Sequence, residues 1–248
     1  MKVCILTLFP ELFTPFWDHG IIRRAIQAEK LDPVTINIRD HAEGRHRVTD
    51  DRPYGGGCGM VMKPEPLTAA LMEAKTRMPQ ATVLLLSPQG RPFDQTLAES
   101  LSATEAMVMV CGRYEGVDER FIDRHVDAEI SIGDFVLTGG ELGAMVITDA
   151  VTRLIPGVLG NADSAQSDTF SDGLVEYAHY TRPPVFDDQD VPDVLLSGNH
   201  QKIDRWRREN ALIRTVLKRP DLLEQRALSA EERRTLEKWR RIIDGLLE

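Results

Sequence analysis

Apolar residues along the first 155 positions form continuous runs that alternate with stretches of helical periodicity. The runs Val3–Leu8, Thr82–Leu86 and Met107–Val110 show no regular polar alternation. Runs of this kind are expected of strands that are buried on both faces of a parallel sheet. A helical spacing of i, i+4, i+7 and i+11 predicts an amphipathic helix between the first two runs. Its apolar positions are Leu67, Leu71, Ala74 and Met78.

Shorter patterns complete the alternation. Ile21–Glu29 and the segment from Glu141 to about Leu154 predict helices, whereas Thr35–Ile38 and Glu129–Ile132 predict short strands. A chain that alternates strands and helices in this way is typical of an α/β layer architecture with right-handed crossovers.

The pattern changes after residue 157. A small, polar stretch at Gly160–Asp168 indicates a flexible linker, and the region after it is mostly helical. Ser229 and Glu232 form a capping-box pattern, and Pro220 stands where a new helix would start. Two apolar stripes predict helices, one at Ile203, Trp206, Ile213 and Val216–Leu217, the other at Leu236, Trp239, Ile243 and Leu246. We therefore predict domains at residues 1–158 and 175–248, joined by a linker at 159–174.

Composition narrows the class of protein. The 248 residues are 42% hydrophobic and 28% charged, which excludes a disordered or collagen-like chain. The three cysteines lie far apart without a Cys-x-x-Cys pair, so neither a disulfide scaffold nor a cysteine-rich zinc site is expected. A reducing, cytoplasmic location suits these cysteines. No apolar run approaches about 18 residues, so no membrane span is expected.

Charge is distributed unevenly. The formal net charge is −9, but Ser197–Arg219 holds seven basic residues against Asp204 and Glu209, a local charge of +5. Taken alone, the composition of this segment favours a solvated helix face. A nucleic-acid contact is the functional alternative, because local charge and not the total decides such binding.

Three of the predicted strands run directly into loops that contain glycine. These loops are Ser87–Gly90, Cys111–Gly116 and Gly133–Gly140. In a parallel sheet all three would lie at the carboxyl edge, where open α/β sheets bind ligands. The alternative is that they are ordinary tight turns between strands and helices.

The known nucleotide, metal and hydrolase motifs are absent from the sequence. No G-x-G-x-x-G follows the first strand, and no Walker A, H-E-x-x-H or G-x-S-x-G motif occurs. The six histidines show no metal-ligand spacing. A glycine-rich segment at Arg45–Met60, with flanking arginines, indicates a close approach to a phosphate-bearing ligand. A disordered loop would explain it as well.

Six motifs in order resemble the bacterial tRNA (guanine-N1)-methyltransferases of the SPOUT superfamily, over Val3 to about Arg219. They are RPYGGGCGM (Arg52–Met60), SPQG (Ser87–Gly90), GRYEG (Gly112–Gly116), SIGDFVLTGGE (Ser131–Glu141), RLIPGVLG (Arg153–Gly160) and LLSGNH (Leu195–His200). The resemblance implies methylation of guanine 37, immediately 3′ of the tRNA anticodon. It also implies a deep trefoil knot in the parallel-sheet domain, a small helical tRNA-binding domain, and a homodimer with active sites at its interface.

The resemblance assigns the methyl donor, S-adenosylmethionine, to the three glycine loops. The implied cofactor residues are Leu86, Ser87, Gly112, Tyr114, Glu115, Ile132, Gly133, Asp134, Phe135, Val136, Leu137, Gly139 and Gly140. Magnesium dependence is associated with the family, but no local carboxylate cluster places an ion, so no metal ligand is assigned.

The reaction itself dictates two further groups. Guanine N1 carries a proton, so a general base is needed, and negative charge then spreads onto O6, where a fixed donor would stabilise it. By similarity Asp168 is the base and Arg153 the donor. Without the resemblance, Asp168 would be interpreted as a solvated turn residue. The chain reads Asp168-Thr169-Phe170 where the family usually has Asp-Ser-Phe, and the threonine keeps the hydroxyl.

The resemblance also gives the basic segment a role in binding tRNA. The residues implied in RNA contact are Arg52, Asn199, His200, Lys202, Arg205 and Arg208. Two rival functions stay open: a ribose 2′-O-methyltransferase of the same superfamily that acts on tRNA or rRNA, and a non-catalytic RNA-binding protein that kept the fold.

Overall fold

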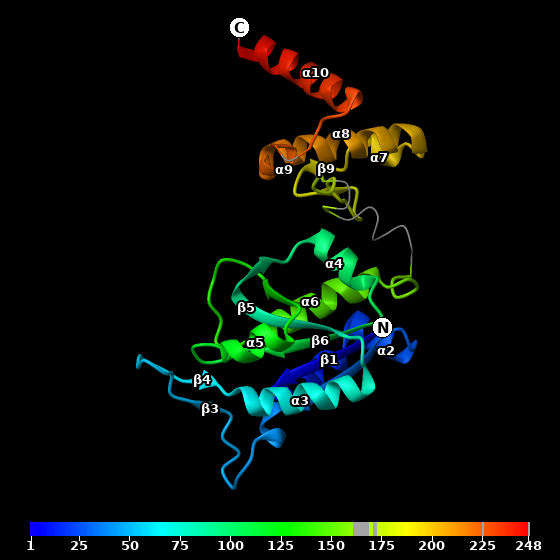
Figure 1. The fold of residues 1–248 in the computed structure, drawn as a ribbon. Helices are drawn as coiled ribbons and strands as arrows, with labels where there is room; N and C mark the ends of the chain where they lie inside the picture. Colours follow the sequence, from blue (N-terminus) through cyan, green and yellow to red (C-terminus); the bar gives the residue numbers. More distant parts are fainter. Residues whose placement is uncertain (161–168, 171–172, 225, 248) are drawn as a thin grey trace. The chain divides into compact units, whose positions relative to one another are not determined.

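The structure is a computed structural model that describes residues 1–160, 169–170, 173–224 and 226–247 (Figure 1). The chain divides into two compact units, Met1–Ala162 and Asp163–Glu248. The division falls inside the predicted linker at 159–174. Each unit is described by itself below.

The first unit is built on a five-stranded sheet in which every pair of neighbours is parallel. The strand order is β2-β1-β6-β5-β7. The strands are β1 (Lys2–Thr7), β2 (Asp32–Asn37), β5 (Thr82–Pro92), β6 (Ala106–Cys111) and β7 (Ala128–Ser131). The prediction of a parallel sheet within an α/β fold is therefore confirmed.

Helices cover both faces of this sheet (Figure 1). One apolar cluster joins the sheet to α2 (Gly20–Gln27), α4 (Gln95–Ser102) and α6 (Glu141–Leu154). The other joins it to α3 (Pro64–Arg77) and α5 (Glu119–His125).

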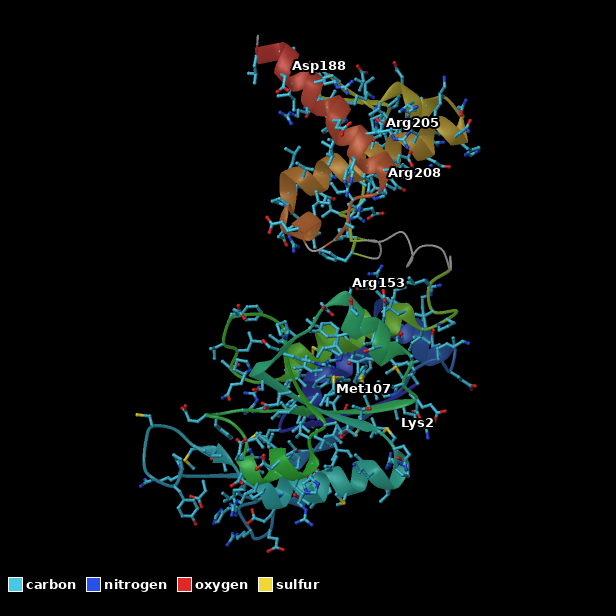
Figure 2. All side chains as sticks on the ribbon, turned by 45° about the horizontal axis from the view of Figure 1, so that its top comes forward. Lys2, Met107, Arg153, Asp188, Arg205 and Arg208 are labelled. Carbon is cyan, nitrogen blue, oxygen red and sulfur yellow. The ribbon has the colours of Figure 1, made fainter. Side chains whose placement is uncertain are left out.

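Successive residues of the central strands serve opposite clusters, which explains their lack of polar alternation. In β1, Ile5 belongs to the first cluster and Leu6 to the second. In β6, Met107 and Val108 alternate in the same way, and both are fully buried (Figure 2). Burial on both faces is therefore the physical origin of the apolar runs.

Local hydrogen bonds set several element boundaries that differ from the predicted ones. The strand expected at Thr35–Ile38 is β2 and ends at Asn37, because the Asn37 side chain accepts a bond from the Arg39 amide (3.0 Å). That contact opens a 3-10 helix, η2 (Ile38–His41). The helix expected to reach Glu29 ends at Gln27, where Glu29 has a positive φ of 55° and the Lys30 amide bonds back to the Ala25 carbonyl.

The segment Ser87–Gly90 is not the simple loop that the sequence predicts. Strand β5 continues through it to Pro92, with a register shift between Leu86 and Arg91, both of which pair with Ile130 of β7. The four residues form an irregularity inside a strand. Their turn-like composition predicts a loop. The structure differs because these residues lie between two segments that both pair with β7, and this non-local pairing leaves no local pattern in the sequence.

Short elements complete the first unit. They are η1 (Pro10–Phe13), α1 (Thr14–Trp17), β3 (Asp50–Asp51) and β4 (Val61–Met62). Strands β3 and β4 pair antiparallel. The glycine-rich segment is therefore the connection of a short hairpin.

The second unit contains four helices and one small hairpin among its described residues. Strands β8 (Val185–Phe186) and β9 (Gln189–Asp190) pair antiparallel. The helices are α7 (Asp193–Leu196), α8 (His200–Lys218), α9 (Asp221–Glu224) and α10 (Ala230–Leu247). The start of a helix just after Pro220 was predicted. The capping box is also confirmed, since Ser229 and Glu232 exchange two hydrogen bonds (2.6 and 3.2 Å).

The core of this unit is small and differs from the predicted stripes. It consists of Leu174, Ala211 and Leu212, with Leu236 of α10 among the partly buried residues packed on it. Leu217, predicted to face inward, is 76% exposed. Three other predicted positions of α10 are also exposed, namely Trp239, Ile243 and Leu246. Within the part of the chain that the structure describes, no helix has the length and apolar character needed to cross a bilayer.

Candidate active site

A cavity of about 380 Å³ opens at the irregularity in β5, the carboxyl ends of β6 and β7 and the start of α6. This size is within the range of pockets that hold drug-sized ligands. Its walls come chiefly from the irregularity in β5, the loop after β6 and the loop between β7 and α6. The predicted convergence of the three glycine-bearing segments is therefore observed.

Twelve of the thirteen predicted cofactor residues line this cavity. They are Leu86, Ser87, Gly112, Tyr114, Glu115, Ile132, Gly133, Phe135, Val136, Leu137, Gly139 and Gly140. The thirteenth, Asp134, lies in the same loop but is exposed and is not part of the lining. The Phe135 amide donates to the Gly133 carbonyl (2.9 Å), so the backbone turns sharply at Asp134.

Gly140 is the point at which the walls of the cavity meet. Its amide donates to the Gly112 carbonyl (2.9 Å). A Cβ at position 140 would lie 2.8 Å from Cys111 Cα and 2.9 Å from Leu86 Cβ. Only glycine permits this approach of backbone to backbone. The chain therefore brings Leu86 of β5 and the end of β6 into direct contact with the start of α6.

A buried carboxylate, Glu141, lies immediately beyond this contact. It is 2% exposed and accepts hydrogen bonds from Thr7 Oγ1 (2.7 Å) and Arg113 Nε (3.1 Å). Arg113 lines the cavity and stacks its guanidinium on the Phe9 ring at 4.2 Å. The sequence interpretation did not assign Glu141 or Arg113 a role. The only sequence feature that could have indicated a role is their place in two motifs, Glu141 in SIGDFVLTGGE and Arg113 in GRYEG.

The glycine-rich segment is bonded to the loop after β6. The Glu115 amide donates to the Met60 carbonyl (3.0 Å), and the Met62 amide donates to the Gly116 carbonyl (2.9 Å). Gly59, at φ 81°, leaves room for the Glu115 side chain, since a Cβ there would lie 2.3 Å from Glu115 Oε1. One wall of the cavity is thus anchored to a segment more than fifty residues away in sequence.

The residues expected to act on guanine are not brought together within the described chain. Arg153 is exposed in the last turn of α6 and does not line the cavity (Figure 2). Asp168 lies outside the described residues. Arg52 is exposed and also does not line the cavity.

The remaining RNA-contact candidates share one helix of the second unit. Asn199 caps α8 by accepting from the Lys202 amide (3.1 Å). His200, Lys202, Arg205 and Arg208 are all exposed on that helix (Figure 2).

Three other basic residues of the segment have internal roles. Arg207 stacks on Tyr177, and Arg214 Nε donates to the Glu176 carbonyl (3.0 Å). Arg219 pairs with Asp221 (2.7 Å), and this ion pair lowers the pKa of the Asp221 carboxyl. Two of the RNA-contact candidates also have internal contacts, since Asn199 caps α8 and Arg205 Nε donates to Glu209 (3.0 Å).

Among the described residues, no group of three or more histidine, cysteine, aspartate or glutamate side chains is placed to hold a metal ion. Cys4, Cys58 and Cys111 are free thiols. Burial raises the pKa of Cys111 well above its usual range, and the nearby Glu141 carboxylate raises it further. A neutral Cys111 thiol is therefore a packing residue beneath the cavity.

The family model and the relatives that match this chain all carry the description of a tRNA guanine methyltransferase. Residues 1–225 match the family described as tRNA (Guanine-1)-methyltransferase TrmD. The tRNA (guanine-N(1)-)-methyltransferase of Syntrophotalea carbinolica is 57% identical over 241 residues, covering 97% of each chain. That of Desulfatibacillum aliphaticivorans is 53% identical over 247 residues, covering 100% of this chain and 94% of its own. That of Staphylococcus carnosus is 53% identical over 242 residues, 97% of this chain and 98% of its own.

Proposed function

Because the chain belongs to the tRNA (guanine-1)-methyltransferase family, we propose that it methylates N1 of guanine 37 in tRNA, next to the anticodon, using S-adenosylmethionine. The observation that carries this proposal is the cavity at the irregularity in β5 and the carboxyl ends of β6 and β7. Three of the motifs that define the resemblance meet there. A protein with this substrate would act in the cytoplasm, where tRNA is available.

The lining of the cavity fits the proposed methyl donor. Backbone groups of Leu86, Gly112 and Ile132–Leu137 would hold the adenosine, because glycine-bearing turns expose N–H and C=O groups to a polar heterocycle. Glu115 would lie near the amino-acid end of the donor. When bound, the donor supplies a methyl group that is already activated by its sulfonium, so no covalent enzyme intermediate is required.

Asp168 and Arg153 would perform the acid–base work on guanine. Asp168 would take the N1 proton, and the N1 lone pair would then form the bond to the methyl carbon while the donor sulfur keeps the electron pair of the broken carbon–sulfur bond. Arg153 donates to O6, where the negative charge of the deprotonated base accumulates. The remaining acceleration comes from holding N1 and the methyl group in line.

The position of Arg153 supports an active site shared between two protomers. Helix α6 carries Glu141 at its first residue, beside the cavity, and Arg153 in its last turn, roughly 18 Å away at 1.5 Å per residue. An arginine side chain does not span that distance. Arg153 would therefore serve the cavity of the partner in a homodimer, and the segment that carries Asp168 would cover it.

The proposed fold of the first unit includes a deep trefoil knot, formed by the chain around the loop after β6 and the loop between β7 and α6. Two contacts between these loops support it. The Gly140 amide bonds the Gly112 carbonyl, and Arg113 forms an antiparallel bridge with Gly139. Knots are otherwise almost absent from proteins, and a knot at this place requires the two loops to lie against each other as they do.

Substitution of Arg205 or Arg208 by alanine is expected to weaken tRNA binding and reduce its salt dependence. Each lost phosphate contact lowers the slope of log affinity against log salt by about one. Filter binding or anisotropy across a salt series measures the slope. Arg240→Ala is the matched control, since Arg240 lies on α10, outside the basic segment, and pairs with Asp244. An unchanged slope in the α8 variants would argue against that surface.

The product of the reaction separates the proposal from its rivals. We expect labelled methyl groups from S-adenosylmethionine to appear in tRNA as N1-methylguanosine after complete nuclease digestion and mass analysis. A 2′-O-methylated nucleoside would instead identify a ribose methyltransferase. Failure of the protein to bind the donor in a calorimeter would favour a non-catalytic RNA-binding protein. A tRNA with adenosine in place of guanine 37 should accept no label.

A further inference from the structure

We propose that Glu141 is a positioning residue of the donor cavity, which fixes Arg113 and cancels its charge so that the guanidinium does not repel the cationic donor. The inference rests on the proposed function, because it takes S-adenosylmethionine as the ligand. It assigns a role to a buried carboxylate that the proposed steps do not use.

The geometry around Glu141 fixes it tightly. One oxygen, Oε1, accepts from both Thr7 Oγ1 (2.7 Å) and Arg113 Nε (3.1 Å). Thr7 is fully buried at the end of β1, and its hydroxyl in turn accepts from the Phe9 amide (3.0 Å). Arg113 is held from its other side by the Phe9 ring. The carboxylate and the guanidinium are therefore each held by two contacts.

The pair also occupies space between two walls of the cavity. A Cβ at Gly139 would lie 2.5 Å from Glu141 Oε2 and 2.6 Å from Arg113 Nε. Arg113 and Gly139 form a backbone bridge at the same place. The loop after β6 and the loop before α6 are thus joined through the ion pair, and both line the cavity.

The net charge of the Glu141–Arg113 pair affects how well the cavity binds a charged ligand. The side chains of Glu141 and Arg113 are only 3% and 20% exposed, so solvent screens them little. Together they contribute no net charge to the cavity wall, whereas Arg113 alone would contribute one positive charge. S-Adenosylmethionine carries a sulfonium that its product, S-adenosylhomocysteine, lacks. An uncancelled guanidinium would therefore repel the donor and leave the product nearly unaffected.

The test compares the affinities of donor and product by calorimetry in wild type and Glu141→Gln. Glutamine has nearly the same shape and can still accept from Thr7. One unit charge within about 10 Å of the sulfonium, at an effective dielectric constant of about 20, changes affinity about tenfold. We expect the dissociation constant of the donor to rise about tenfold more than that of the product. A merely structural role would raise both equally.

Two further variants test the direction in which the charge of the pair changes the ratio of donor to product affinity. Arg113→Gln leaves the negative charge and should shift the ratio of affinities toward the donor. The double variant R113Q/E141Q restores neutrality and should restore the wild-type ratio, whatever its absolute affinities. These variants also decide the matter if Glu141→Gln does not fold. Equal changes for both ligands would overturn the inference while leaving the proposed function intact. Failure of the wild type to bind either ligand would overturn the proposed function itself.

Discussion

Replacement of Asp168 by alanine is expected to lower the rate of methyl transfer about 10²- to 10⁴-fold, because this is the usual contribution of a general base and guanine N1 cannot attack while protonated. Affinity for S-adenosylmethionine should stay within about twofold, since the implied donor residues lie in the three loops of the cavity and not at position 168. Single-turnover kinetics measures the chemical step, and calorimetry measures donor binding.

Asp163→Ala is the matched control for this variant, as a second aspartate of the same polar segment. It should methylate tRNA at nearly the wild-type rate. If Asp168→Ala also turned over normally, Asp168 would not be the base, and another group would have to take the N1 proton.

Subunit mixing tests which protomer supplies Asp168. Glu115 lines the cavity, so a Glu115→Ala chain should have an impaired donor site but an intact Asp168. In a two-fold dimer with shared sites, a heterodimer of Asp168→Ala and Glu115→Ala chains has one site with both residues intact. Mixing the two poorly active variants, followed by subunit exchange, should therefore recover roughly a quarter of wild-type activity. No recovery would mean that each chain uses its own Asp168.

Gly140→Ala is expected to abolish measurable donor binding and to destabilise the fold by about 1–3 kcal/mol, the usual range for overpacking. The added methyl group would lie 2.8 Å from Cys111 Cα and 3.2 Å from the Gly112 nitrogen. Because these are backbone atoms of a central strand and its loop, no side-chain rotation relieves the contact. Calorimetry measures donor binding, and chemical denaturation measures the free energy of unfolding.

Gly160→Ala provides the control for an added methyl group. No atom lies within 4 Å of the Cβ position there, and the residue has no positive φ. Its stability should change by no more than about 0.5 kcal/mol, as for most surface substitutions. Normal donor binding by Gly140→Ala would show that the cavity tolerates a wider gap between the loop after β6 and α6.

Local features of this chain were predictable because they depend on local physics. Continuous apolar runs predict the strands β1 and β6, because both faces of each strand are buried. The capping box at Ser229 and Glu232 is visible because three-residue spacing alone defines it. The order of six motifs identified the family, and twelve of the thirteen implied donor residues do line one cavity.

Non-local contacts were not predictable in the same way. Ser87–Gly90 reads as a turn, but pairing with β7 on both sides keeps it within β5. Leu217 fits an apolar stripe, yet the small core of the second unit is filled by Ala211 and Leu212 instead. Which apolar residues are buried depends on what the rest of the chain offers to cover them.

The sequence by itself determined the class of fold, the family and the segments that form the cavity, because hydrophobic patterns and the order of motifs are properties of the sequence alone. Only the tertiary structure decided that Glu141 is a buried partner of Thr7 and Arg113, and that Arg153 lies at the opposite end of α6 from the cavity. The reason is strand order. Placing β1 beside β6 and β6 beside β5 brings residues 134 positions apart into hydrogen-bonding distance, and no local pattern encodes that meeting.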